Sequence, residues 1–334
     1  MIEEKLRFWR QSVDFSLLRS LSIHAQSVSY DAGAPALALG LQSLEHLVLF
    51  MDNNSHGAPD AEFLQSIRPL SSISLRNMRE PAPLEALAGH GTTLKHLTVT
   101  MGIMAQLNMF SVNFIQRLRD QTPHLEYLEM PVWRSQGDAG EVAFYRAIGR
   151  LPQLRRVVLT LLYGYSAAQL AIPATPKVEG SRDYLLAEGA VDENLARSIF
   201  KVMLSANSAG QGKGRNLQYL RIEPCRYDRG MRDTSGYDVK KLRRDVYRAI
   251  LANIVRCWIC DTSWSEGMRD GVSVRPALEH VGMEEILRRE AKRFPVVGAT
   301  WKRLWPCEDE ELFENWSSFP LKNWETTLCK ALED

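Results

Sequence analysis

The chain repeats one pattern of hydrophobic and polar positions. An apolar residue is followed by two variable residues, a second apolar residue, one variable residue and a third apolar residue. The last two apolar positions have the period of two that is typical of a short β-strand. A weaker copy is Ile254-Cys257-Ile259. The clear copies begin at Leu18, Leu44, Leu70, Leu94, Leu125, Leu154 and Leu217.

A stretch compatible with a helix lies between most successive copies. The last of these stretches has Leu195, Ile199 and Met203 at helical spacing, behind Asp192, whose carboxylate suits a helix N-cap. Pro and Asn residues at the joints favour turns. The sequence therefore predicts helices over Ala61–Arg68, Leu84–His90, Asn108–Arg119, Glu141–Arg150 and Glu193–Ala206.

The first six copies begin 26, 26, 24, 31 and 29 residues apart. A strand followed by a helix at this interval is close to the leucine-rich-repeat unit. Because each unit has an apolar face that it cannot bury alone, stacking is expected to make a parallel concave sheet with helices behind it. In regular repeats, an Asn or Cys three residues after the last apolar residue of the strand forms a hydrogen bond with the turn. Here only Gln26, Asp52 and Cys225 could do this, so the turns should be uneven. We predict an irregular α/β leucine-rich-repeat solenoid of about seven to eight repeats.

The intervals also predict the domain organisation. Residues 1–17 should cap the first repeat, and residues 18–262 should form the solenoid, with a long loop inserted at about 164–192. Residues 263–334 should form a helical cap that begins with a helix over Pro276–Phe294 and is rich in Trp. The alternative for this end is an acidic and aromatic segment that docks a basic partner. Its Trp residues are Trp301, Trp305, Trp316 and Trp324.

Several segments resemble the leucine-rich-repeat region of fungal F-box-type proteins, the substrate receptors of ubiquitin ligases. The resemblance covers residues 15–262 and rests on LQSLEHLVL, TTLKHLTVT, PHLEYLEMP, LPQLRRVVLT, NLQYLRIEP and VDENLARSIFKVML. It implies a substrate-recognition role and a ligase adaptor as partner. An F-box would precede the repeats, and Met1–Leu17 is too short to hold one. A repeat scaffold without a role in ubiquitin transfer is therefore the alternative.

Strand side chains alternate between the two faces of a sheet, so the variable residues between the apolar positions should face outward, on the concave side. Aromatic, His and Arg side chains are favoured at protein interfaces. They concentrate in the middle and far part of this face. The predicted partner-binding residues are His96, Tyr127, Glu129, Arg156, Tyr219 and Arg221.

Cys257-Trp258-Ile259-Cys260 has the spacing of a metal or redox site. In the repeat register Cys257 should point into the core and Cys260 to the opposite face, so the two thiols cannot share a metal. Gly164-Tyr165-Ser166 is one Gly short of the nucleophile-elbow pattern G-x-S-x-G. In that hypothesis Gly89-His90-Gly91 would be the oxyanion loop. Asp228 or Asp261, with His280, would complete a catalytic triad with Ser166. A serine hydrolase is thus a third hypothesis, but the preceding strand already belongs to a repeat. We predict no catalytic residue, cofactor or metal.

Composition narrows the classes of partner. Lys and Arg total 41 against 40 Asp and Glu, so no large net charge favours nucleic acid or an anionic membrane. Neither a signal peptide nor a membrane-spanning apolar run is evident, and five scattered Cys do not form a disulfide framework. We therefore expect a cytoplasmic or nuclear module that binds another protein.

Overall fold

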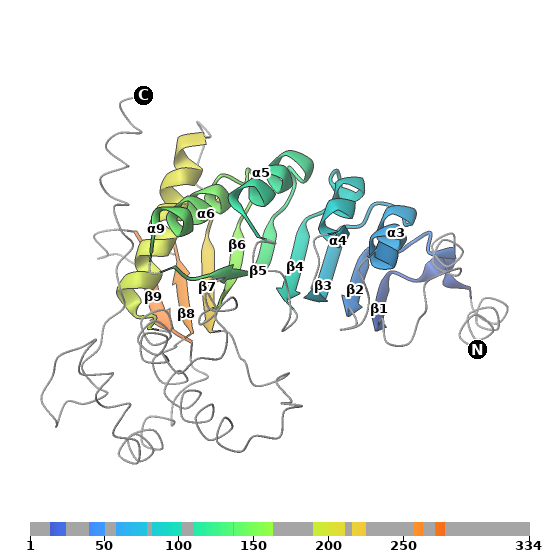
Figure 1. Cartoon of the computed structure of the whole chain (residues 1–334). Coiled ribbons are helices and arrows are strands. Elements are labelled where there is room, and N and C mark those ends of the chain that lie inside the picture. Colours follow the sequence, from blue (N-terminus) through green and yellow to red (C-terminus); the bar gives the residue numbers. More distant parts are fainter. Residues whose placement is uncertain are drawn as a thin grey trace, which may run out of the picture. The chain divides into compact units, whose positions relative to one another are not determined.

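A computed structural model describes residues 14–24, 40–50, 58–78, 82–101, 110–135, 137–162, 190–210, 216–224, 257–262 and 271–277. Its strands form a nine-stranded, mostly parallel open sheet in the order β1 to β9 (Figure 1). The strand bounds are β1 Ser20–His24, β2 His46–Phe50, β3 Ser72–Met78, β4 His96–Met101, β5 Tyr127–Trp133, β6 Arg156–Leu162, β7 Tyr219–Pro224, β8 Trp258–Asp261 and β9 Ser273–Pro276.

The first five strands are parallel and in the register that the repeat alignment predicts. Ser20 pairs with His46, His46 with Ser72, Ser72 with His96 and His96 with Tyr127. The register shifts between Leu75 and Met78, where Asn77 has a φ of 63°. Asn tolerates this left-handed conformation better than most residues. This irregularity lies within β3, and the turn after the strand lies outside the described residues.

A recurring hydrogen bond sets this register. The two amides at the start of a strand both donate to the carbonyl just before the preceding strand. Glu45 and His46 donate to the Arg19 oxygen at 2.9 Å each. The same arrangement recurs with Glu45, Ser71, Lys95 and Glu126 as acceptors. These acceptors follow one another at the spacing of the sequence repeat.

The three apolar positions of the repeat form the core. From the second copy to the seventh, each of these side chains is at most 1% exposed. In the first copy only Ile23 is buried, at 9% exposure. The apolar period therefore predicted the buried face of the strands correctly. The second to seventh copies contribute Leu44, Leu47, Leu49, Leu70, Ile73, Leu75, Leu94, Leu97, Val99, Leu125, Leu128, Met130, Leu154, Val157, Leu159, Leu217, Leu220 and Ile222.

The five helices expected between the repeat copies are present with shifted ends, and the one expected over Leu84–His90 is a short α-helix followed by a 3₁₀ turn. The Ser111 hydroxyl accepts from the Phe114 amide, so α5 starts after Ser111 and not at Asn108. The Asp192 carboxylate accepts from the Leu195 amide at 2.8 Å, which confirms the predicted N-cap. The bounds are α3 Ala58–Ser66, α4 Ala82–Glu85, the 3₁₀ turn η3 Ala86–His90, α5 Val112–Gln121, α6 Ala139–Gly149 and α9 Glu193–Gly210. A 3₁₀ turn, η1 Phe15–Leu17, precedes β1.

The chain divides into two compact units. The first contains residues 1–131, 147–157 and 206–217, and the second contains 132–146, 158–205 and 218–334. In the first unit, α3 contacts both α4 and η3. The side chains of Asn207 and Asn216 stabilise this unit further. Nδ2 of Asn207 donates to the Gly149 carbonyl at 3.0 Å, and Nδ2 of Asn216 donates to the Pro152 carbonyl at 2.7 Å.

The last strands of the second unit correct the prediction of a parallel eighth repeat. β8 is antiparallel to β7, and β9 is antiparallel to β8. Within β8, Trp258 and Cys260 are buried while Ile259 and Asp261 are partly exposed. The strand is therefore one residue out of the predicted register, because the indole of Trp258 occupies the core and donates to the Val191 carbonyl at 2.7 Å.

The remaining predicted segments are described only at their edges. β9 is a strand that the sequence did not predict, and it ends at Pro276, where the expected helix was to begin. Four predicted segments lie outside the described residues: the rest of that helix, the Trp-rich end, residues 164–189 of the inserted loop and most of the 1–17 cap.

Candidate protein-binding face

The outward face of the first unit consists of the alternate strand residues that point away from the core. Residues of β1 to β5 and the start of β6 contribute to it. Four of the predicted binding residues lie here: His96, Tyr127, Glu129 and Arg156. Tyr219 and Arg221 belong to the second unit.

His96, Tyr127 and Arg156 occupy equivalent positions on three successive strands. His96 pairs with Tyr127 in the register, and their rings lie 6.0 Å apart. The Arg156 amide donates to the Glu126 carbonyl as the Tyr127 amide does to Lys95. His96 and Arg156 are exposed and Tyr127 is half-buried. The structure therefore brings these three predicted residues together in one row.

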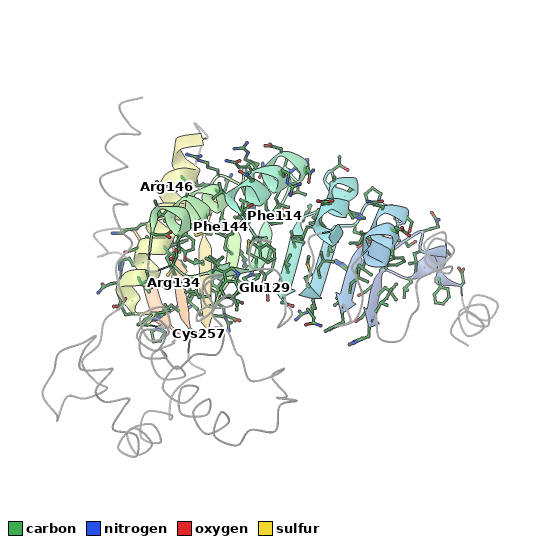
Figure 2. The ribbon with its side chains drawn as sticks, in the orientation of Figure 1. Phe114, Glu129, Arg134, Phe144, Arg146 and Cys257 are labelled. Carbon is green, nitrogen blue, oxygen red and sulfur yellow. The ribbon has the colours of Figure 1, made fainter. Side chains whose placement is uncertain are left out.

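The carboxylate of Glu129 is held by two hydroxyl groups. Tyr127 donates to its Oε2 at 3.0 Å, and Thr98 donates to the same atom at 3.2 Å (Figure 2 labels Glu129). An ionised carboxylate accepts such bonds strongly. The two contacts fix a negative charge in the middle of the outward face.

A second row of this face joins β1, β2 and β3. His24 pairs with Phe50 and Phe50 with Arg76, so the three side chains follow one another across the strands. The His24 and Phe50 rings are stacked at 4.0 Å, and the Arg76 guanidinium lies 5.8 Å from the centre of the Phe50 ring. β2 and β3 extend through Phe50 and Arg76, so the alternation of faces along each strand predicts this row.

Two residues expected on the outward face are buried. Val158 is 7% exposed, and Pro131 is buried as well. The side chains at these two positions are therefore covered and do not face solvent.

Tyr219 and Arg221 have other neighbours in the second unit. Tyr219 pairs with Asp261 and Arg221 with Ile259 in the antiparallel register. Nε of Arg221 lies 2.6 Å from the Glu223 carboxylate. The two residues thus lie beside β8, where the sequence predicted a parallel neighbour.

His90 and Gly91 have structural roles, which removes the suggested oxyanion loop. The His90 side chain is buried; its Nδ1 accepts from the Leu70 amide at 3.2 Å, and its Nε2 lies 3.0 Å from the Leu64 carbonyl. Burial lowers the pKa of His90. A side chain added at Gly91 would collide with the Gln121 carbonyl. Ser166, Asp228 and His280 lie outside the described residues.

A buried polar cluster follows β5. The Glu141 carboxylate accepts from the Ser135 and Gly137 amides at 2.8 and 2.9 Å and from the Tyr145 hydroxyl at 2.7 Å. Nε of Arg134 lies 3.1 Å from the same carboxylate (Figure 2 labels Arg134). Burial, followed by the charge of Glu141, raises the pKa of Tyr145. The donors around Glu141 satisfy its carboxylate and hold the segment that leads into α6.

Both cysteines of the CxxC sequence are buried free thiols, so the prediction that Cys260 points outward is wrong. Cys257 precedes β8 and Cys260 lies within it (Figure 2 labels Cys257). Burial raises the pKa of Cys260 to about 12. The part of the chain that the structure describes contains no group of three His, Cys, Asp or Glu side chains placed to hold a metal ion. Its helices include none with the length and apolar character needed to cross a membrane.

No protein-family model matches the sequence, and no significant match is found among curated proteins.

Proposed function

We propose that the chain is an irregular leucine-rich-repeat solenoid whose outward sheet face binds another protein. The observation that carries this proposal is the row formed by His96, Tyr127 and Arg156, set in register by the repeated amide-to-carbonyl bonds. Aromatic side chains offer a large contact area at low entropy cost, and Arg can donate several hydrogen bonds to a partner.

The test is affinity purification from an extract of the source cells. The bait is the full chain, compared with Tyr127→Ala/Arg156→Glu and with Gln116→Ala/Arg117→Glu. The control pair is exposed on α5, away from the row. A partner that binds the wild type and the α5 variant, but not the face variant, supports the proposal once binding is repeated with purified components. Capture of the same proteins by all three baits would contradict it.

The more specific role, substrate recognition within an F-box-type ubiquitin ligase, rests on the resemblance of the repeats. The same purification tests it, because a ligase adaptor would be captured together with the partner. A partner without ligase subunits would favour a repeat scaffold unrelated to ubiquitin.

A further inference from the structure

Two arginines on the outward face of the first unit have no ion-pair partner among the described residues. They are Arg76 on β3 and Arg156 at the start of β6. The strand arginines of the second unit differ, since Arg221 lies beside Glu223 and Arg275 beside Asp261. An arginine that lacks an internal carboxylate is available to one from a partner.

Arg76 is also held in place. Its guanidinium lies over the Phe50 ring, which is stacked on His24. A cation over an aromatic face is attracted to it, and the contact restricts the long side chain. Binding to Arg76 should therefore cost less side-chain entropy than binding to a freely moving arginine.

Glu129 supplies the opposite charge between the two arginines. Its Oε2 accepts from Tyr127 and Thr98, and no cation of the described residues lies within ion-pair distance. The face thus presents charges in the order positive, negative, positive, from Arg76 through Glu129 to Arg156. An entirely acidic ligand, such as nucleic acid or a polyglutamate tract, would meet the carboxylate of Glu129 at the centre.

The sheet geometry gives the spacing. With strands about 4.8 Å apart and a rise of about 3.3 Å per residue, Arg76 lies about 12 Å from Glu129, and Glu129 about 8 Å from Arg156. The three positions lie close to one diagonal across the strands. An extended chain covers this length of about 20 Å in about six residues.

We infer that the outward face binds an extended peptide segment with two acidic residues about six positions apart and a basic residue between them, nearer the Arg156 end. The inference rests on the proposed function and adds the chemistry of the partner. The two acidic side chains contact Arg76 and Arg156, and the basic side chain contacts Glu129. Charge order, and not net charge, then determines which segments bind.

The experiment uses a random dodecapeptide library displayed on phage, selected against the full chain. Peptides that also bind Arg76→Glu/Arg156→Glu are removed. The enriched peptides should share the acidic, basic, acidic order. A synthetic peptide with this order should bind Arg156→Glu at least about tenfold more weakly in fluorescence anisotropy, because like charges then meet. It should bind Arg117→Glu, the control on α5, as it binds the wild type. Selection against Arg156→Glu should replace the acidic residue at one end with Lys or Arg.

The outcomes separate this inference from the proposed function. Enriched peptides that need Tyr127 but lack the charge order would overturn the inference and leave the protein-binding face in place. Peptides that bind Tyr127→Ala/Arg156→Glu as well as the wild type would contradict both. Failure to enrich any peptide would overturn the inference, while the affinity purification would still decide the proposed function. Circular dichroism of each variant confirms that it is folded.

Discussion

Nε of Arg134 lies 3.1 Å from Oε1 of Glu141, and neither side chain has exposed surface. The two partners are not equally satisfied. The Glu141 carboxylate also accepts from the Ser135 and Gly137 amides and the Tyr145 hydroxyl. The guanidinium nitrogens of Arg134 make no hydrogen bond of good geometry among the described residues. Arg134 therefore depends on Glu141 more than Glu141 depends on Arg134.

This asymmetry predicts the order of two destabilisations. Glu141→Gln leaves a buried guanidinium without a counter-charge and should lower the free energy of unfolding by about 3–5 kcal/mol. Arg134→Met leaves a carboxylate that keeps its other donors, so the loss should be smaller, about 1–3 kcal/mol. Urea denaturation measures both. The reverse order would show that Arg134 has partners that compensate it.

His90 should make the stability of the fold depend on pH. Its Nδ1 accepts from the Leu70 amide, so the neutral ring must carry its proton on Nε2, facing the Leu64 carbonyl. Burial lowers the pKa of His90 from 6.5. The unfolded state then binds the proton more readily, and the stability present above pH 6.5 is lost as the pH falls below it.

The measurement is the free energy of unfolding of the wild type and of His90→Gln between pH 5 and pH 8. The amide of Gln can both accept and donate but does not titrate. The difference in stability between the two proteins should therefore narrow as the pH falls. A difference that is constant with pH would contradict the role of His90.

Gly91 and Gly89 form a matched pair for a test of packing. A methyl group at Gly91 would collide with the Gln121 carbonyl, whereas nothing lies within 4 Å of one at Gly89. Gly91→Ala should lower the melting temperature, at a cost of about 1–3 kcal/mol. Gly89→Ala should be neutral or raise stability by up to about 1 kcal/mol, since alanine restricts the unfolded chain. Equal effects in a thermal melt would refute the close approach.

The thiol of Cys260 should be unreactive in the folded protein. Its pKa is raised from 9.0 to about 12 by burial, which lowers the thiolate fraction at pH 8 about a thousandfold. Iodoacetamide at pH 8 should leave Cys260 unmodified in the native state and alkylate it in urea, as mass spectrometry of tryptic peptides can show. Rapid native labelling would indicate that β8 opens readily.

The repeat pattern predicted most of the sheet because each apolar position of a repeat is also a core position. Leu47, Ile73, Leu97 and Leu128 therefore predicted both burial and register. Helix starts were less predictable because one cap decides them, as Ser111 does for α5.

The last strands escaped prediction because apolar spacing does not distinguish parallel from antiparallel pairing. In β8 the residues Trp258 to Cys260 are all compatible with a core position, so the pattern fitted two registers. The large indole of Trp258 is buried and sets the observed one.

The candidate face was predictable as a set of positions and not as a set of contacts. His96, Tyr127 and Arg156 were found from the alternation of side chains along strands. The hydroxyl contacts of Glu129 and the stack of Arg76 on Phe50 depend on rotamers, which a one-dimensional pattern does not specify.

The shared carbonyl acceptors before each strand have a consequence for how such a chain can change in evolution. The carbonyls of Arg19 and Glu45 accept the same pair of amide bonds from the following strand, so the alignment of each strand follows from the strand before it. Deletion of one whole repeat, such as residues 46–71, would join Glu45 to Ser72, which occupies the position of His46 in the next strand. The pairing of every later strand would then be preserved. A deletion of a single residue inside a strand would instead turn all its following side chains to the opposite face. Gain and loss of whole units is therefore the route by which the length of this sheet would change in evolution.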